Sequence, residues 1–188
     1  LLEKSTGIAT VEGGCASCHH HNITDIVASV AKEKGIRTDE KSAADRQQLT
    51  RAPFFLPLNL LERLDGPGSP NVPLYAVAAL AGSGYPADRI TDALVSNLIA
   101  QQQADGYWRA PMGAASRPPL DGDDITRTAL AVSMMTAYGS PGRGADIAER
   151  IGRARTVRLR TNVDEWLTLG PDHPLRLRRA VDAAAQAG

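Results

Sequence analysis

The sequence predicts an all-α protein made of tandem helical hairpins, and three observations lead to this class. Apolar residues recur every three or four positions in several windows, as they do along one face of an amphipathic helix. Valine and isoleucine nowhere alternate with polar residues for long, as they would in a half-buried strand. Helix-start and helix-stop patterns recur about every 50 residues, which is typical of stacked units that bury their apolar faces against their neighbours.

The first two helices are predicted from their caps. Asn22 is expected as the N-cap of the first helix, and Gly35 is expected to end it in the C′ position. A second helix is expected from Asp39 to about Arg51, and the prolines that follow leave only one or two helical turns around 58–64. The apolar face of the first helix is predicted to consist of Ile23, Ile26, Val27, Val30 and Ala31.

A third helix is predicted over residues 72–81, with Gly84 just beyond its end. Pro86 is expected in the first turn of a fourth helix, because proline suits a position whose backbone N–H has no helical partner. The stretch 104–123 is rich in glycine and proline and is therefore predicted to be loop. The fourth helix carries an apolar stripe of Ile90, Leu94, Leu98 and Ile99.

Asp124 is expected to cap a fifth helix that stops at Gly139, and a sixth helix is predicted from about Ala145. The helix starts at Asn22, Asn71 and Asp124 correspond to one another and indicate a repeat of two helices per unit. A glycine and then an aspartate follow in the first two units, namely Gly35 and Asp39, then Gly84 and Asp88.

Length and charge exclude several classes of protein. We expect one domain over residues 1–188, in which residues 156–188 fit the repeat poorly. The 21 acidic and 21 basic residues cancel, so no overall field attracts nucleic acid or an anionic membrane. No apolar run approaches the roughly 18 residues that a transmembrane segment needs. No signal peptide pattern is visible, and the opening residues read like the end of a helix, so we expect a longer or processed product.

The most specific pattern is the segment that precedes the first predicted helix. Cys15 and Cys18 are the only cysteines, and His19 follows them directly, which gives the C-x-x-C-H spacing of c-type haem attachment. Two thiols three positions apart can each form a thioether with one haem vinyl group, and the next histidine can bind the iron. The sequence therefore predicts one covalent haem c on segment 13–22, with His19 as the proximal iron ligand.

Three other interpretations of this segment remain open. Cys15 and Cys18 could form a redox-active dithiol, although that motif normally belongs to a strand-rich unit. They could bind zinc together with His20, His21 or His173, although no second ligand pair with zinc spacing is present. The pattern could also have arisen by chance.

The opposite face of the iron needs its own candidate. Met112 is the first choice as distal ligand, because it lies in a predicted loop and methionine is a known axial ligand of haem iron. His173, also in a predicted loop, is a further option. Met134 and Met135 are expected to pack in the core. Arg109 and Arg117 flank the loop around Met112 and are candidates to pair with haem propionates, although solvated surface charge is their usual role.

The residues Leu98-x₃-Gln102-x₃-Gly106-Tyr107-Trp108 resemble the QW motif of the squalene-hopene cyclase and prenyltransferase-like α/α toroids. Residues 118–132 look like the inner helix that follows it, so the resemblance is clearest over 71–139. The chain also looks like the bacterial subset in which a Cys-x-Ser-Cys-His segment precedes such repeats. The resemblance implies a partial α/α toroid, in which the glutamine amide bonds helix-end backbone and the indole stacks on a neighbouring turn. The haem would then lie at one end of the helical barrel.

A class II terpene cyclase is an alternative, because Asp121-Gly122-Asp123-Asp124 has the D-x-D-D spacing of that family, with Asp123 as the proton donor. The family pattern places threonine directly after the last aspartate, whereas Ile125 stands there in this chain. Aromatic residues, which stabilise carbocations, make up only 4% of the chain. An N-cap cluster at the start of a helix is the favoured interpretation of these aspartates. The zinc ligands of the prenyltransferase branch have no match.

We therefore expect a c-type cytochrome-like, single-electron carrier on a helical repeat scaffold. Haem attachment to thiols follows export in bacteria, so the expected location is periplasmic or extracellular. The expected partner is a redox protein or a larger complex of respiratory or photosynthetic type. The alternatives are a cofactor-free interaction module, which could self-associate through an exposed apolar flank, and the cyclase using Asp123. Whether the chain is an enzyme stays open.

Overall fold

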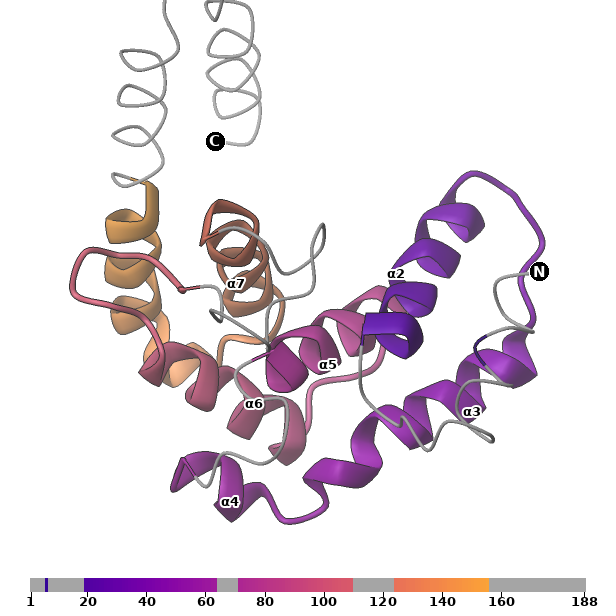
Figure 1. Cartoon of the computed structure of the whole chain (residues 1–188), viewed down its shortest axis with the longest axis horizontal. Helices are drawn as coiled ribbons and strands as arrows, with labels where there is room; N and C mark the ends of the chain where they lie inside the picture. Colours follow the sequence, from indigo (N-terminus) through magenta and orange to yellow (C-terminus); the bar gives the residue numbers. More distant parts are fainter. Residues whose placement is uncertain (1–5, 7–18, 64–70, 110–123, 156–188) are drawn as a thin grey trace, which may run out of the picture.

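The computed structural model describes residues 6, 19–63, 71–109 and 124–155 (Figure 1). These residues form helices joined by turns and loops and contain no strand, which confirms the all-α class. The elements in chain order are α2 (His19–Glu33), α3 (Glu40–Arg51), η1 (Ala52–Phe54), α4 (Pro57–Leu61), α5 (Asn71–Gly82), α6 (Arg89–Ala100), α7 (Asp124–Tyr138), η3 (Pro141–Arg143) and a last helix over 144–155.

The helices form two rows. In one row, α5 lies between α2 and α7 and contacts both (Figure 1). In the other row, α3 packs against α2 and α5, while α6 packs against α5 and α7 and carries α4 on its side. Helix 144–155 lies against α6, because Arg143, just before it, bonds Ser96 and its Arg150 bonds the carbonyl of Ile99. The units are thus helical hairpins, and their closure into a partial toroid stays a prediction.

The glycines that end the first helix of the first and second hairpins have the same geometry. Gly35 and Gly84 both have positive φ, at 73° and 69°, and both follow a helix end. Two backbone hydrogen bonds close each helix. The N–H of Gly35 donates to the carbonyl of Lys32, and the N–H of Gly84 donates to that of Ala81. In both cases the next residue donates to a carbonyl one residue further back than that. A side chain at either position would be strained, so the prediction that glycine ends both helices is confirmed.

The aspartates that follow these glycines are the N-caps of α3 and α6. Asp39 accepts hydrogen bonds from the backbone N–H groups of Lys41 and Ser42, and Asp88 accepts them from Ile90 and Thr91. Both contacts satisfy donors that have no partner inside the helix. The predicted start of the second helix is therefore confirmed. The predicted role of Pro86 is wrong, because α6 begins at Arg89, after the cap.

The predicted N-cap role of Asn22 is also wrong. Helix α2 already begins at His19, so Asn22 lies in its first turns and is fully buried. Asn71 is likewise the first residue of α5. The side chain of Asn71 accepts a hydrogen bond from Arg127 of α7. These asparagines join neighbouring helices, which a capping pattern alone does not reveal.

The buried face of α2 differs from the predicted apolar one. Val27 and Val30 are 46% and 51% exposed, whereas Asn22, Thr24 and Asp25 are at most 2% exposed. The reason lies in the partner helix, because α3 turns polar side chains toward α2. Of the predicted face, Ile26 packs against the core and Val27 and Val30 are exposed, while the side of α2 that faces α3 is polar.

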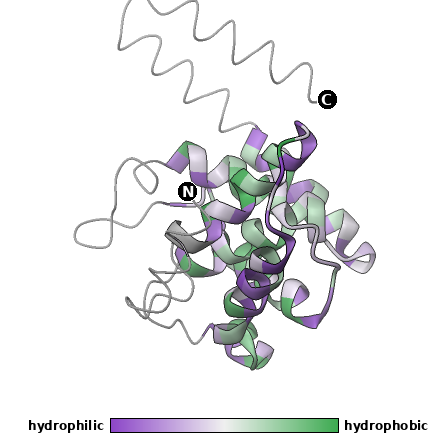
Figure 2. Cartoon of the chain, turned by 90° about the vertical axis from the view of Figure 1, so that its right-hand side faces the viewer, coloured by the Kyte–Doolittle hydropathy of each residue, from purple (hydrophilic) through white to green (hydrophobic). Residues whose placement is uncertain are grey.

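The apolar core is centred on α5 and α6. Leu74, Val77 and Leu80 of α5 and Leu94 and Leu98 of α6 are at most 1% exposed. Figure 2 shows apolar residues concentrated on the helices at the centre of the molecule. Met134 and Met135 of α7 join this core, as predicted. Burial of these side chains is the main stabilising contribution to the hairpin stack.

The QW-like residues connect the end of α6 to helix 144–155. The Nε2 atom of Gln102 donates to the carbonyl of Arg150 at 3.0 Å and to that of Gly106 at 3.2 Å. Trp108 is 1% exposed, and its indole N–H donates to the carbonyl of Leu98 at 2.7 Å. The prediction that the glutamine amide bonds helix backbone is confirmed. The indole adds a hydrogen bond of its own at the end of α6.

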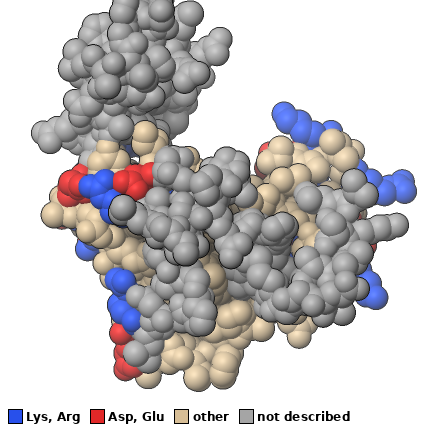
Figure 3. Space-filling model, in the orientation of Figure 1, with Lys and Arg blue, Asp and Glu red and all other residues tan. Residues whose placement is uncertain are grey.

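Within the described parts of the chain, no helix combines the length and hydropathy required to cross a membrane. In the view of Figure 3, acidic and basic side chains lie together on the side of α7 and helix 144–155. Lysine and arginine predominate on the side of α2 and α3. The charge of the chain is thus balanced overall but unevenly placed on this face.

Candidate functional site

The candidate haem site lies at the start of α2. His19, the predicted proximal ligand, is the first residue of this helix, and only its backbone is described. Cys15, Cys18 and the predicted distal ligand Met112 lie outside the described residues, as does the alternative ligand His173. What the structure adds is the way in which the helix that follows the motif is held.

The first turns of α2 are fixed to α3 by two buried polar contacts. The hydroxyl of Thr50 donates to Oδ1 of Asn22 at 3.2 Å, and Nε of Arg46 donates to Oδ1 of Asp25 at 2.6 Å. The Arg46 and Asp25 side chains are 5% and 1% exposed. A charge-assisted hydrogen bond at this distance, removed from solvent, is among the stronger polar contacts in a protein. Helix α2 therefore has a defined position on α3 within two turns of His19.

A third contact holds the chain on the other side of the cysteines. The hydroxyls of Thr6 and Thr24 lie 2.6 Å apart and both side chains are buried. Thr6 precedes the Cys-x-x-Cys-His segment and Thr24 follows it. Thr6 and Thr24, which flank the Cys-x-x-Cys-His segment in the sequence, are thus held together.

The side-chain amide N–H of Asn22 has no acceptor among the described residues. Its Nδ2 atom is buried, and no described residue accepts a hydrogen bond from it. Leaving a buried donor without a partner costs about 1–3 kcal/mol, so such groups commonly face a ligand or ion. Asn22 lies one helical turn after His19. The Nδ2 atom of Asn22 is thus a buried donor one turn from the candidate haem ligand.

The second predicted site segment begins after Arg109 and ends before Asp124. Arg109 forms an ion pair with Asp124 at 2.6 Å, a second with Asp105, and stacks on the ring of Tyr107 at 4.5 Å. The hydrogen bond to Asp124, followed by the two carboxylate charges, raises the pKa of Arg109. Arg109 and Asp124 thus join the two ends of the segment that carries Met112.

Of the four residues in the D-x-D-D pattern, only Asp124 is described. It is the first residue of α7 and pairs with Arg109, which is how an acidic residue at a helix N-terminus commonly behaves. Asp121 and Asp123, like Arg117, lie outside the described residues. The contacts of Asp124 agree with a structural role in the first turn of α7, and the cyclase interpretation of Asp123 stays a prediction.

A polar cluster at the junction of the hairpins was not predicted from the sequence. The hydroxyl of Tyr85 donates to Oδ2 of Asp88 at 2.9 Å, and Arg51 bonds the same oxygen at 3.0 Å while lying 4.7 Å from the Tyr85 ring centre. Burial raises the pKa of Asp88, but the hydrogen bonds from Thr91, Tyr85 and Ile90 and the charge of Arg51 outweigh it, so the net pKa is lowered.

The same junction contains Tyr138, whose hydroxyl donates to the carbonyl of Tyr85 at 2.7 Å. Burial, with smaller contributions from the charges of Asp88 and Tyr85, raises the pKa of Tyr138 to about 12. Aligning the helix starts Asn71 and Asp124 pairs Tyr85 with Tyr138. This repeated tyrosine was the only hint of the cluster in the sequence. The cluster joins three units and stabilises the stack.

Among the described residues, no group of three or more His, Cys, Asp or Glu is arranged to hold a metal ion. Comparisons with models of known protein families, with curated proteins and with solved structures found no match to this chain.

Proposed function

We propose that this chain is a c-type cytochrome-like protein that carries one covalent haem on Cys15 and Cys18 and transfers single electrons. The observation that carries the proposal is the Cys-x-x-Cys-His order itself, because haem attachment requires these residue types at these offsets. His19 would bind the iron, and the bound haem would supply a one-electron couple whose potential depends on its axial ligands.

Two structural features support this assignment. The helix that starts at His19 is held by buried contacts to α3, so a ligand on its first residue would have a fixed base. The buried Nδ2 atom of Asn22 is a donor suited to a haem propionate, since an amide N–H and a carboxylate form a charge-assisted hydrogen bond. The role of Asn22 would be to hold that carboxylate.

Met112 would bind the opposite face of the iron. Arg109 and Asp124, which flank the segment that carries Met112, form an ion pair. The protein would be exported to the periplasm or the cell exterior, and it would exchange electrons with a redox protein or a larger electron-transfer complex.

A cofactor-free interaction module is the second candidate, and a specific observation favours it. Apolar side chains of the segment from η1 to α4 are exposed, namely Phe55 at 70%, Leu58 at 59%, Leu61 at 53% and Leu56 at 50%. Neighbouring large apolar side chains exposed in this way are typical of surfaces that contact another molecule.

A pyridine haemochrome assay decides between the two. The full chain is expressed in a host that exports it and attaches haem, then purified and denatured before measurement. We expect one haem per chain and a mass increased by one haem, both lost in Cys15→Ser/Cys18→Ser. A colourless wild-type chain, or cysteines that bind zinc or each other, would contradict the proposal.

The axial ligands are tested separately on the coloured protein. His19→Ala should reduce the yield of thioether-linked haem, because attachment requires the histidine, and any haem that is attached should have a changed absorption spectrum and midpoint potential. Met112→Leu should lower the midpoint potential and remove the sulfur-to-iron charge-transfer band, because sulfur ligation raises the potential. Met134→Leu is the matched control, since Met134 belongs to the core. An unchanged spectrum in Met112→Leu would assign the distal site to another residue.

A further inference from the structure

The interface between α2 and α3 is polar at positions where the second hairpin is apolar. Aligning Gly35 with Gly84 and Asp39 with Asp88 pairs each residue of the first hairpin with one of the second. In this register, Asp25 corresponds to Leu74, Arg46 to Val95 and Thr50 to Ile99. All six side chains are buried. The same fold is therefore built with an apolar interface in one unit and with a buried ion pair in the other.

The ion pair is not needed to hold two such helices together. Moving two charges out of water is costly, and apolar side chains of similar size commonly give an equal or more stable interface. The α5–α6 hairpin shows that an apolar pair fits the same fold, because Leu74 and Val95 fill the equivalent positions in its core. Packing alone therefore does not require a charged pair here, which leaves Asp25 and Arg46 available for another role.

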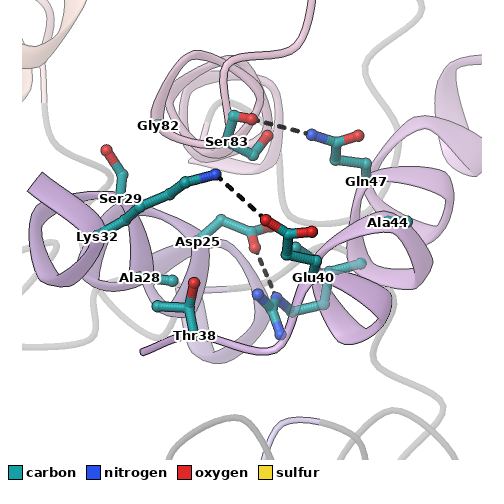
Figure 4. A pocket seen from close by; sticks show the side chains of 12 residues that line it. Asp25, Ala28, Ser29, Lys32, Thr38, Glu40, Ala44, Gln47, Gly82 and Ser83 are labelled. Carbon is teal, nitrogen blue, oxygen red and sulfur yellow. Dashed lines mark hydrogen bonds and ion pairs between the residues drawn. The ribbon is translucent and has the colours of Figure 1, made fainter. Parts of the chain in front are cut away.

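A cavity lies directly above this ion pair. It has a volume of about 230 Å³ and lies between α2, α3 and the end of α5 (Figure 4). Its walls include the small residues Ala28, Ala44 and Gly82. A Cβ at Gly82 would lie 3.1 Å from the Cα of Ile26, so glycine lets α5 approach α2 closely at this point. The space is smaller than the roughly 300–1,000 Å³ of sites for drug-sized ligands.

The charges of the cavity form two layers. The buried Asp25–Arg46 pair lines its interior. Lys32 and Glu40 lie 3.6 Å apart at its mouth (Figure 4). The mouth pair is 71% and 84% exposed, so it contributes little to stability and can separate at low cost. The four ionisable groups sum to no net charge. An anion bound to Lys32 would leave Glu40 without a partner, and a cation bound to Glu40 would leave Lys32 without one.

We propose that this cavity binds a small zwitterion of the amino-acid or betaine class. Lys32 would take the carboxylate of the ligand, and Glu40 would take its cationic group, once their own contact opens. The buried pair below would supply an environment in which a neutral but dipolar ligand is solvated by fixed charges. Ser29, Thr38 and Gln47 also line the cavity and offer hydroxyl and amide groups for further hydrogen bonds. The ligand would contact none of the residues proposed to hold the haem, and the two sites share only the Asp25–Arg46 pair, which also positions α2.

Isothermal titration calorimetry on the full chain tests the proposal with L-serine and glycine betaine as probes. Erythritol, succinate and putrescine represent a neutral polyol, an anion and a cation. We expect saturable binding of at least one zwitterion and weaker binding of the other three. No binding of either zwitterion, or tighter binding of the polyol or of an ion of one sign, would overturn the proposal.

Two variants locate the binding. Asp25→Leu/Arg46→Val copies the interface of the second hairpin, so it should fold with an unchanged or higher Tm while losing the zwitterion by about tenfold or more in affinity. Lys32→Gln/Glu40→Gln changes only exposed side chains and should also weaken binding. Lys34→Gln, on the neighbouring turn outside the cavity lining, is the matched control. Wild-type affinity in both double variants would show that the probe binds elsewhere.

Discussion

In the α2–α3 hairpin and in the α5–α6 hairpin, the first helix ends at a glycine with positive φ and the second begins at a capping aspartate. Between these matched ends the two interfaces differ, because one buries Asp25 against Arg46 and the other buries Leu74 near Val95. The ends are fixed by local backbone requirements, which only a few residue types meet. The interior has to be complementary across the two helices, and either an apolar or a charged pair can satisfy that condition.

This comparison separates residues that build the repeat from residues that are free to serve a function. A unit whose ends are conserved in geometry can change its interior without changing its fold. The hairpin with the polar interior is also the one that follows the Cys-x-x-Cys-His segment. The residues proposed to hold ligands thus lie in or next to the first unit, while the second unit provides much of the apolar core.

The largest effect is expected from removing one member of the buried pair. Arg46→Leu leaves the Asp25 carboxylate buried beside an apolar group, and breaking a buried pair in this way costs about 3–5 kcal/mol of unfolding free energy. The double variant Asp25→Leu/Arg46→Val should instead be as stable as the wild type, or more so. Urea denaturation followed by circular dichroism measures both. A double variant as unstable as Arg46→Leu would show that the two hairpins are not interchangeable inside.

The corresponding change in the second hairpin is Leu74→Ala. Leu74 is 1% exposed in the core, and truncating a buried leucine costs about 2–5 kcal/mol through lost burial and the cavity that remains. Unlike the loss of one member of the ion pair, this loss cannot be rescued by a second substitution of Val95 to a polar residue. The measurement is again the urea midpoint. Leu58→Ala, at a 59% exposed position of α4, is the control and should have little effect.

The sequence was sufficient to predict the features that depend on local backbone geometry. Gly35, Gly84 and Asp39 were recognised because a left-handed turn and a helix cap each favour particular residues, whatever the surroundings. Asp88 was seen only as a repeated aspartate, and its capping role was missed because Pro86 was placed in the first turn instead. The buried face of α2 was predicted wrongly. Its burial depends on Arg46 and Thr50 of α3, and a single-helix pattern contains no information about a partner.

In the candidate haem site, too, some features could be predicted from the sequence and others only found in the structure. Cys15, Cys18 and His19 were singled out because their chemistry depends on spacing along the chain, and their role stays a prediction. The contacts around them, such as Thr6 with Thr24, join residues far apart in sequence and could be found only in the structure. Aligning the repeats would have revealed Asp25 and Arg46, since both occupy positions that are apolar in the next unit.

A moderate effect is expected at the capping aspartates, where the two hairpins can be compared at matched positions. Asp88→Ala removes a cap and the contacts with Arg51 and Tyr85, so we expect a loss of about 1–2 kcal/mol at pH 7. Asp39→Ala removes a more exposed cap and should have a smaller effect. The lowered pKa of Asp88 means that its stabilisation is present above its unfolded pKa near 3.8 and is lost as the pH falls below that value.

Thermal melts between pH 7 and pH 2.5 test this difference. The wild type should lose Tm in the acid range, and Asp88→Ala should lose less of it, because the titrating group is absent. If Asp39→Ala flattened the acid profile more than Asp88→Ala, the contacts made by Arg51 and Tyr85 would have no part in the stability of the second cap.

The smallest effect concerns the position that follows the helix-ending glycine in each unit. Ile36 is 62% exposed in the first unit, whereas its counterpart Tyr85 accepts a hydrogen bond from Tyr138 through its carbonyl. Tyr138→Phe should therefore cost about 0.5–1.5 kcal/mol at pH 7, the contribution of one such bond. Because the pKa of Tyr138 is raised to about 12 against an ordinary value of 10.0, its stabilisation is complete below pH 10 and decreases as the pH rises toward 12. Burial and Asp88 also raise the pKa of Tyr85, so ultraviolet titration should show late ionisation of both Tyr85 and Tyr138. Tyr138→Phe should remove the contribution of Tyr138, while Ile36→Ala leaves the titration unchanged. A Tyr138 that ionises near pH 10 would mean that the junction between the second and third hairpins opens to solvent.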